Sequence, residues 1–141
     1  MPKSENHLAA LREVNQLAKF NNWLGLVVVS ASEGEVELRL AWREEFGQYA
    51  GYLHAGIIAA LLDTACGFAA YALSGWVLAS QLSVKCLRPA IADTFIVRGR
   101  VIKPGKQQIF AAAELASLDA PQRLLAIGDT LLVPTGDRTA R

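Results

Sequence analysis

The spacing of apolar residues changes several times along the chain, and each change predicts a new element. Near the N-terminus, apolar residues recur every three or four positions, which predicts a short amphipathic helix within residues 1–22. The residues at this spacing are Leu8, Leu11, Val14 and Ala18. We expect Asn21 and Asn22 to end the helix. The next apolar run, residues 23–31, is rich in β-branched side chains and predicts a strand.

A second strand, a long helix and four more strands are predicted after the turn at Glu33–Gly34. Residues 36–42 alternate between apolar and polar, which is typical of a half-buried strand that forms a hairpin with the first. Residues 43–53 predict a loop. Residues 55–73 predict a helix that is apolar on nearly every face and ends at Ser74–Gly75. The later strand-like runs are 76–88, 94–103, 107–118 and 123–133, with 119–122 as a separating loop and 135–141 as a frayed tail.

This order of elements predicts one α+β domain over residues 1–141, in which an antiparallel sheet wraps one long central helix. A helix that is apolar all round must be covered all round. One sheet covers only one side of the helix. We therefore expect a second copy of the chain to pack against the other side.

Composition narrows the class of protein. Hydrophobic residues make up 52% of the 141 residues and charged residues 19%, which excludes a disordered chain. The net charge of +1 argues against a nucleic-acid partner, because no basic excess is available to neutralise phosphates. Two cysteines do not make a disulfide framework, so we expect a reducing, cytoplasmic compartment. No His/Cys cluster has the spacing of metal ligands, so no metal is expected.

Residues 53–73 are long and apolar enough to suit a bilayer, but Asp63 lies at their centre. A carboxylate in the middle of a bilayer costs about 2.5–3.5 kcal/mol on insertion scales. We therefore favour a core helix over a membrane span. The first residues of the chain show no apolar stretch of the kind found in signal peptides.

Asp63 is the first candidate for chemistry. A carboxylate inside an apolar helix is costly unless it is paired or functional. Its helical neighbours are all small and none carries a positive charge: Ala59, Ala60, Cys66 and Gly67. Asp63 is therefore either a catalytic carboxylate or a structural one that hydrogen-bonds Thr64 or a strand backbone. The cysteines Cys66 and Cys86 are interpreted as small core residues.

The start of the same helix is the second candidate. No Ser, Thr, Asp or Asn stands at its N-cap, although His54 could serve as one. Free N–H groups at a helix N-terminus can polarise a carbonyl oxygen. His54 precedes Asp63 by nine residues, so the two lie about 13 Å apart along the helix axis. If both act on one carbonyl, two antiparallel helices from two chains must bring them together.

These residues also resemble a known signature. Residues 48–65, QYAGYLHAGIIAALLDTA, resemble the motif of hotdog-fold acyl-CoA thioesterases, most closely the phenylacetate-pathway, or PaaI-type, group. The family pattern is Asn or Gln, then Gly, then His-Gly-Gly, then an acid nine residues after the His. Leu87-Arg88-Pro89-Ala90 and Lys103-Pro104-Gly105-Lys106 resemble later family segments. The likeness covers about residues 23–133.

The resemblance implies a hotdog fold and hydrolysis of a CoA thioester, with Asp63 as nucleophile or general base. It implies that the backbone N–H of Ala55 polarises the thioester carbonyl, with Gln48 near the carbonyl or the water and His54 shaping the helix start. Gly56 and Ser80 are the implied substrate-binding residues: Gly56 allows close approach, and Ser80 is the candidate that assists from the next strand. Because CoA carries phosphates, Arg88 is a further candidate for substrate binding, and a solvated side chain at a strand end is the other interpretation of Arg88. No cofactor beyond the CoA of the substrate is implied. The implied assembly is a homodimer, paired into a tetramer.

Two departures from the family pattern keep other functions open. Ala55 stands where the family has Gly, and Ser80 is the nearest match to a Ser or Thr of the following strand. These departures allow a domain that binds acyl-CoA without hydrolysing it. A hydratase or dehydratase of acyl thioesters is the other alternative, although its local motifs are not found here. The sequence does not indicate which acyl group is bound.

Overall fold

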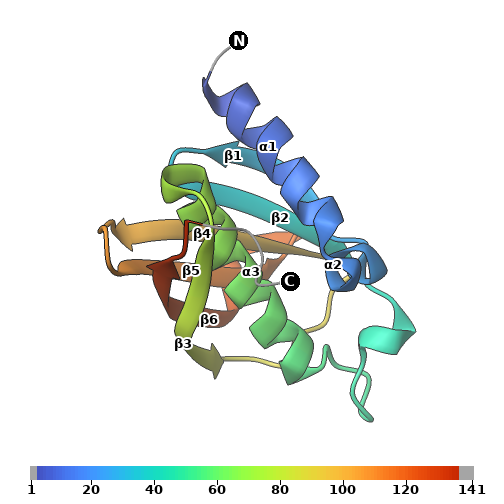
Figure 1. Ribbon diagram of the computed structural model, residues 1–141. Coiled ribbons are helices and arrows are strands. Elements are labelled where there is room, and N and C mark those ends of the chain that lie inside the picture. Colours follow the sequence, from blue (N-terminus) through green and yellow to red (C-terminus); the bar gives the residue numbers. More distant parts are fainter. Residues whose placement is uncertain (1–2, 137–141) are drawn as a thin grey trace.

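Six antiparallel strands form one sheet in the order β1-β2-β4-β5-β6-β3, and a long helix, α3, lies across the sheet (Figure 1). This computed structural model describes residues 3–136. The helices are α1 Lys3–Leu17, α2 Lys19–Leu24 and α3 Ala55–Ser74, with a 3-10 turn η1 at Glu44–Phe46. The strands are β1 Val27–Ser32, β2 Glu35–Ala41, β3 Val77–Cys86, β4 Thr94–Lys103, β5 Ile109–Ser117 and β6 Ala120–Pro134.

The prediction of an α+β fold with an antiparallel sheet wrapped around one central helix is confirmed. The predicted long helix, 55–73, differs from α3 by one residue. One side of α3 packs on the sheet and supplies much of the core. Its buried residues are Ile58, Leu61, Leu62, Ala65, Cys66, Phe68, Ala69 and Ala70.

Two strand glycines let α3 lie close against the sheet. A Cβ added to Gly99 on β4 would collide with the backbone carbonyl of Ala65 on α3. A Cβ on Gly128 of β6 would lie 2.8 Å from the carbonyl oxygen of Ser83 and 3.1 Å from Leu62 Cδ1. Close backbone approach is a common reason for glycine inside a strand. The absence of a side chain at Gly99 and Gly128 therefore allows the short distance between α3 and the sheet.

The N-terminal segment differs from the prediction. Asn21 and Asn22 do not end a helix, because both lie inside α2, and Trp23 belongs to α2 rather than to a strand. The chain turns instead at Gly25, whose φ of 72° is left-handed. The side-chain amide of Asn22 donates to the carbonyl of Gln16 at 2.8 Å, which joins α2 to α1. The first predicted strand is therefore reduced to β1.

The predicted loop at 119–122 is also wrong in length. Ser117 pairs with Ala120, so the β5–β6 connection is a tight hairpin. Pro121 and Gln122 lie in the first residues of β6. Proline is tolerated at the start of a strand, where a missing N–H costs least. Of the predicted tail, 135–141, residues 137–141 lie outside the described residues, as do Met1 and Pro2 at the other end.

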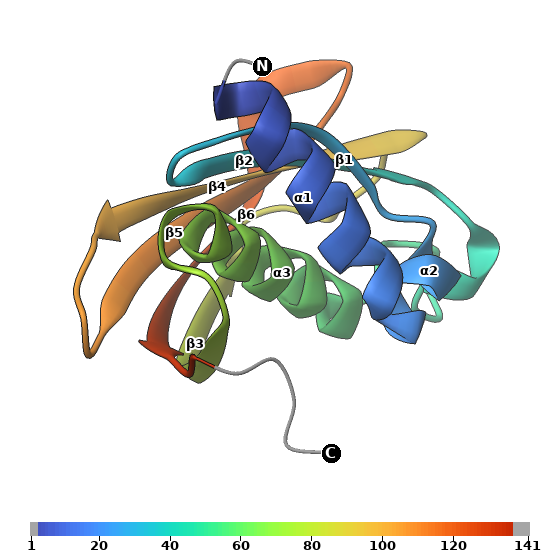
Figure 2. The same cartoon turned by 45° about the horizontal axis from the view of Figure 1, so that its top comes forward.

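Two surfaces of this fold are open. Strand β3 forms one edge of the sheet, and most of its residues are exposed. The face of α3 turned away from the sheet is half-buried at several positions, including Ala60, Asp63 and Gly67. In Figure 2, α1 runs beside α3 but leaves much of this face open. Within residues 3–136, α3 alone is long and apolar enough to cross a membrane, and here it packs on the sheet.

Candidate active site at the start of α3

His54 caps the central helix. Its Nδ1 accepts the backbone N–H of Gly56 at 2.8 Å, and its φ and ψ of −61° and 135° are extended, as an N-cap requires. The helix is therefore capped by a side chain. The sequence had left open whether His54 serves as the N-cap. Ala55, the residue between His54 and Gly56, is exposed, and its backbone N–H has no hydrogen-bond partner within residues 3–136. This N–H points from a helix N-terminus and is free to bind an oxygen atom.

The loop before the helix is held by Gln48. Its side-chain oxygen accepts a short hydrogen bond from the N–H of Ala50 and a longer one, 3.4 Å, from that of Tyr52. Its backbone N–H donates to the carbonyl of Tyr52 at 2.8 Å. Gly51, with a φ of 86°, allows the sharp turn between these contacts. Gln48 thus shapes the loop that delivers the chain to His54.

Asp63 lies in the middle of α3 with its carboxylate half-buried. Burial raises the pKa of this carboxyl above its ordinary value of 3.8, because water is displaced from the charged form. The neighbouring Thr64 is not its partner, since the Thr64 hydroxyl donates to the carbonyl of Ala60 at 2.7 Å. No hydrogen bond or ion pair to Asp63 is formed within residues 3–136. The structure therefore presents a carboxylate without the structural partners considered above.

Cys66, one turn after Asp63, is fully buried. Burial raises the pKa of its thiol to about 11, and the negative charges of Asp63 and Asp129 add to that rise. A thiol with this pKa is protonated near neutral pH and is a poor nucleophile. The Cys66 side chain fills the core, as its position in an apolar helix predicts, whereas the same interpretation is wrong for Cys86, which is exposed near the end of the edge strand β3.

One chain does not bring the candidate residues together. His54, Ala55 and Gly56 form the first turn of α3, whereas Asp63 lies more than two turns further along. Ser80 lies on the exposed edge strand β3 at an irregularity in pairing, where its hydroxyl donates to the carbonyl of Leu131 at 3.3 Å. Within one chain, Asp63 is therefore not placed beside the N-terminus of α3.

Arg88 lies beyond the end of β3 and is connected to the start of α3. Its guanidinium donates to the carbonyl of Leu124 at 2.5 Å, and Arg88 and Arg123 line an open cavity of about 730 Å³. The N–H of Leu53 donates to the carbonyl of Ala90 at 3.0 Å, two residues after Arg88. Sequence inspection missed Arg123. Its place beside Arg88 follows from the long-range pairing of β3 with β6, which no local pattern indicates.

A second cavity, of about 770 Å³, opens on the sheet face away from α3. Charged residues of both signs line it, among them Arg98 and Glu114, which form an ion pair at 2.9 Å. It contains none of the candidate residues. Within residues 3–136, no group of three or more His, Cys, Asp or Glu side chains is arranged to hold a metal ion.

Comparison with known proteins identifies the family. The family model of the thioesterase superfamily matches residues 50–121, about half of the chain, from the loop before α3 to the start of β6. The chain belongs to the thioesterase superfamily.

Relatives of this thioesterase superfamily member agree in sequence and fold. A protein of Halobacterium salinarum named "Putative esterase VNG_1336C" is 34% identical over 120 residues, which cover 76% of this chain and 78% of that protein. A thioesterase family protein from Silicibacter pomeroyi is 30% identical, with a TM-score of 0.85 over 90% of this chain and 96% of the other.

The E. coli PaaI protein from the phenylacetic acid degradation operon shares the fold, with a TM-score of 0.87. That match covers 96% of this chain and 97% of the PaaI chain at 20% identity. The fold of this thioesterase superfamily member is therefore the hotdog fold, and it is PaaI-like, as the resemblance implied.

Proposed function

We propose that the protein is an acyl-CoA thioesterase that hydrolyses a CoA thioester to the free acid and CoA. One observation carries the proposal. The N–H of Ala55 is free at the N-terminus of α3, and a half-buried carboxylate without a partner, Asp63, lies on the open face of the same helix. The first can polarise a thioester carbonyl, and the second can supply or activate the attacking oxygen.

In the proposed reaction, the thioester carbonyl oxygen accepts the Ala55 N–H, and the helix dipole stabilises the negative charge that develops there. As general base, Asp63 takes a proton from water while the water oxygen bonds to the carbonyl carbon. The C–S bond then breaks and the thiolate of CoA leaves with the proton. As nucleophile, Asp63 bonds to the carbonyl carbon while the C–S bond breaks and CoA leaves as the thiolate; water then hydrolyses the resulting mixed anhydride to the free acid and regenerates the carboxylate. The raised pKa of Asp63 makes its carboxylate a better proton acceptor.

The proposal requires a homodimer. Two α3 helices that pack antiparallel through their open faces would set Asp63 of one chain beside Ala55 of the other. Such an interface is the same surface on both chains, as two-fold symmetry demands. The exposed edge strand β3 is a second surface that a partner can cover, because its outward N–H and C=O groups are available for pairing. A pair of such dimers, in the cytoplasm, completes the proposed assembly.

The remaining site residues have supporting roles in this proposal. Gln48 and His54 hold the loop and the first turn of α3 in the shape that exposes the Ala55 N–H. Gly56 leaves room for the acyl thioester beside that turn. Arg88, joined to the start of α3 through Ala90, meets the phosphates of CoA. Ser80 assists from β3 of either chain.

One observation supports a second candidate function, a domain that binds acyl-CoA without turnover. Ala55 stands at a position where the family carries Gly, and its Cβ narrows the approach to the N–H. The substitution Ala55→Gly separates the two functions. A large gain in hydrolysis would indicate a site disabled by the methyl group, and a loss or no gain would indicate a working site adapted to alanine.

The test is CoA release, measured with a thiol reagent across aryl and aliphatic acyl-CoAs. The proposal predicts turnover of at least one class of thioester by the native chain. Binding of acyl-CoA without release of CoA from any substrate would replace the thioesterase with the binding domain.

A further inference from the structure

Two adjacent N–H groups join the start of α3 to two different parts of the molecule. The N–H of Leu53 donates to Ala90 at 3.0 Å, and the N–H of His54 donates to Phe46 at 2.9 Å. Ala55, whose N–H is proposed to bind the thioester carbonyl, directly follows these two residues in the chain, so it lies next to both neighbouring segments.

The segment on the Ala90 side is cationic. Arg88 and Arg123 line the open cavity there, and no acidic side chain lines it. A guanidinium has five N–H donors, of which Arg88 uses one on the carbonyl of Leu124. This side suits the phosphate end of an amphipathic substrate.

The segment on the Phe46 side is aromatic. Phe46 is buried, and its ring meets the ring of Trp23 edge-on with centroids 5.2 Å apart. Phe20 lies next to Trp23 at 6.0 Å. Arg43 stacks on Phe46 at 4.4 Å and donates to the carbonyl of Trp23 at 2.6 Å, which fixes α2 to the loop after β2.

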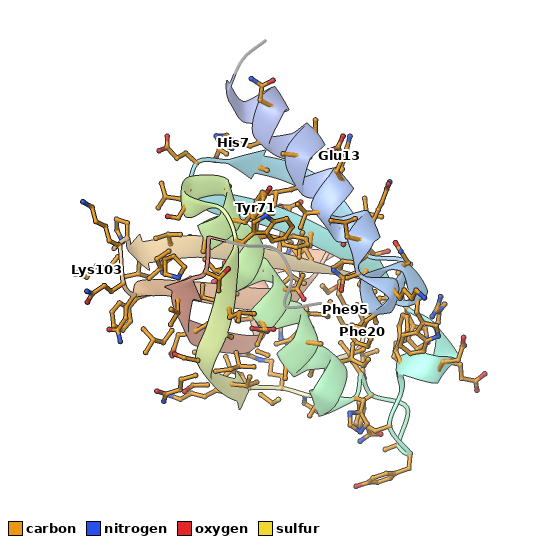
Figure 3. The ribbon with its side chains drawn as sticks, viewed as in Figure 1. His7, Glu13, Phe20, Tyr71, Phe95 and Lys103 are labelled. Atoms are coloured by element: carbon orange, nitrogen blue, oxygen red, sulfur yellow. The ribbon has the colours of Figure 1, made fainter. Side chains whose placement is uncertain are left out.

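The outer part of this aromatic segment is exposed. Leu17, Phe20 and Trp23 are 54%, 47% and 46% exposed, and their spacing of three residues places them at the junction of α1 and α2. In Figure 2, α2 lies at the end of the molecule where α3 begins. Figure 3 shows Phe20 at this end, with Lys103 at the opposite end of the sheet. We call these three residues the apolar shelf.

The geometry points to the apolar shelf as the surface that binds the acyl group of the substrate, and to an aryl or long-chain acyl group as the preferred class. The inference rests on the proposed thioesterase function. A CoA thioester has phosphates at one end, an apolar group at the other and the carbonyl between them. Leu53 contacts Ala90, near Arg88 and Arg123, whereas His54 contacts Phe46, which packs on the shelf residue Trp23, and Ala55 directly follows both contacts in the chain.

The test compares Phe20→Ala with Phe110→Ala. Phe110 is a matched control, because it is a phenylalanine of similar exposure, 44%, on the outer side of β5. Each variant is assayed with phenylacetyl-CoA, decanoyl-CoA and acetyl-CoA. We expect Phe20→Ala to lower kcat/KM roughly two- to tenfold for the two larger substrates, which is the range of one aromatic contact, and to leave acetyl-CoA nearly unchanged. Phe110→Ala should change none of them.

A binding measurement separates this inference from the proposed function. The probes are CoA thioethers that carry a phenylethyl, a decyl or an ethyl group, and binding is measured by calorimetry. Weaker binding of the two larger thioethers by Phe20→Ala supports the shelf even if no thioester is hydrolysed. An equal change for all three probes, no change for any, or a change in oligomeric state instead would overturn it. The last result would assign the shelf to a second copy of the chain.

Discussion

At the scale of single residues, Asp63 combines an energetic cost with a proposed role. Burial raises its pKa, so the folded protein holds the proton more tightly than the unfolded chain. Between the unfolded value near 3.8 and the higher folded value, stability therefore falls as pH rises. At neutral pH the ionised carboxylate opposes folding. Retaining such a residue is understandable if it serves the reaction.

The first prediction follows from the destabilising effect of the ionised Asp63 carboxylate. Asp63→Asn should raise Tm at pH 7, because the amide is not charged when buried, and the gain should shrink as pH falls toward 3.8. Asp119→Asn, at an exposed turn, is the control and should change Tm little at either pH. Thermal unfolding followed by circular dichroism measures both. A lower Tm for Asp63→Asn at pH 7 would show that Asp63 has a stabilising partner.

The second prediction concerns the N–H of Ala55. Proline has no N–H, but it is favoured at the first position of a helix, and the extended backbone of His54 is suitable before proline. Ala55→Pro should therefore keep Tm within a few degrees while kcat falls about 10²–10³-fold, the usual cost of one lost oxyanion donor. Ala55→Ser retains the N–H and should keep most activity. Full activity in the proline variant would remove Ala55 from the mechanism.

Sequence alone indicated most of these site residues but not their partners. The spacing of nine residues placed His54 and Asp63 on one helix and too far apart to act together within a chain. That His54 caps the helix, and that Thr64 turns to Ala60 rather than to Asp63, depends on side-chain rotamers. Arg123 comes next to Arg88 only through the long-range pairing of β3 with β6.

At the scale of elements, the seat of α3 on the sheet depends on Gly99. The third prediction is that Gly99→Ala lowers stability by about 1–3 kcal/mol, because the added methyl group collides with the backbone of Ala65. Arg100→Ala, at the next position of β4, is exposed and faces away from the helix, so it should change stability by less than about 0.5 kcal/mol. Urea unfolding measures both. Equal stability of the two variants would show that α3 can move away from the sheet at little cost.

The elements differed in how well the sequence predicted them. Strands β2 and β4 and helix α3 carry strong apolar periodicity, and their predicted bounds agree with the structure to within a residue or two. The segment around Trp23 was predicted wrongly, because a run of apolar residues fits a short helix as well as a strand. Tertiary contacts determine the helix there, since Asn21 is buried and Gly25 supplies the left-handed turn that ends it.

At the scale of the whole molecule, the open surfaces predict association. Strand β3 is ten residues long, contains no proline and exposes Leu78 at 67%. The fourth prediction is that the native chain sediments as a dimer or larger, and that Leu78→Lys shifts it toward monomer, since an edge lysine opposes strand pairing. Leu118→Lys, at an exposed leucine of the β5–β6 turn, should leave the assembly unchanged. A native monomer at micromolar concentration would contradict the proposed site.

The central claim is that each site takes Asp63 from one chain and the Ala55 N–H from another. The most direct test is CoA release by a purified mixed dimer of one Asp63→Asn chain and one Ala55→Pro chain, separated by different affinity tags. Such a dimer contains one intact site of two, so it should recover about half of the native rate although both parents are inactive. A mixed dimer of the native chain with the doubly substituted chain should be nearly inactive. No recovery in the first dimer, with about half the native rate in the second, would place both groups in one chain and contradict the account.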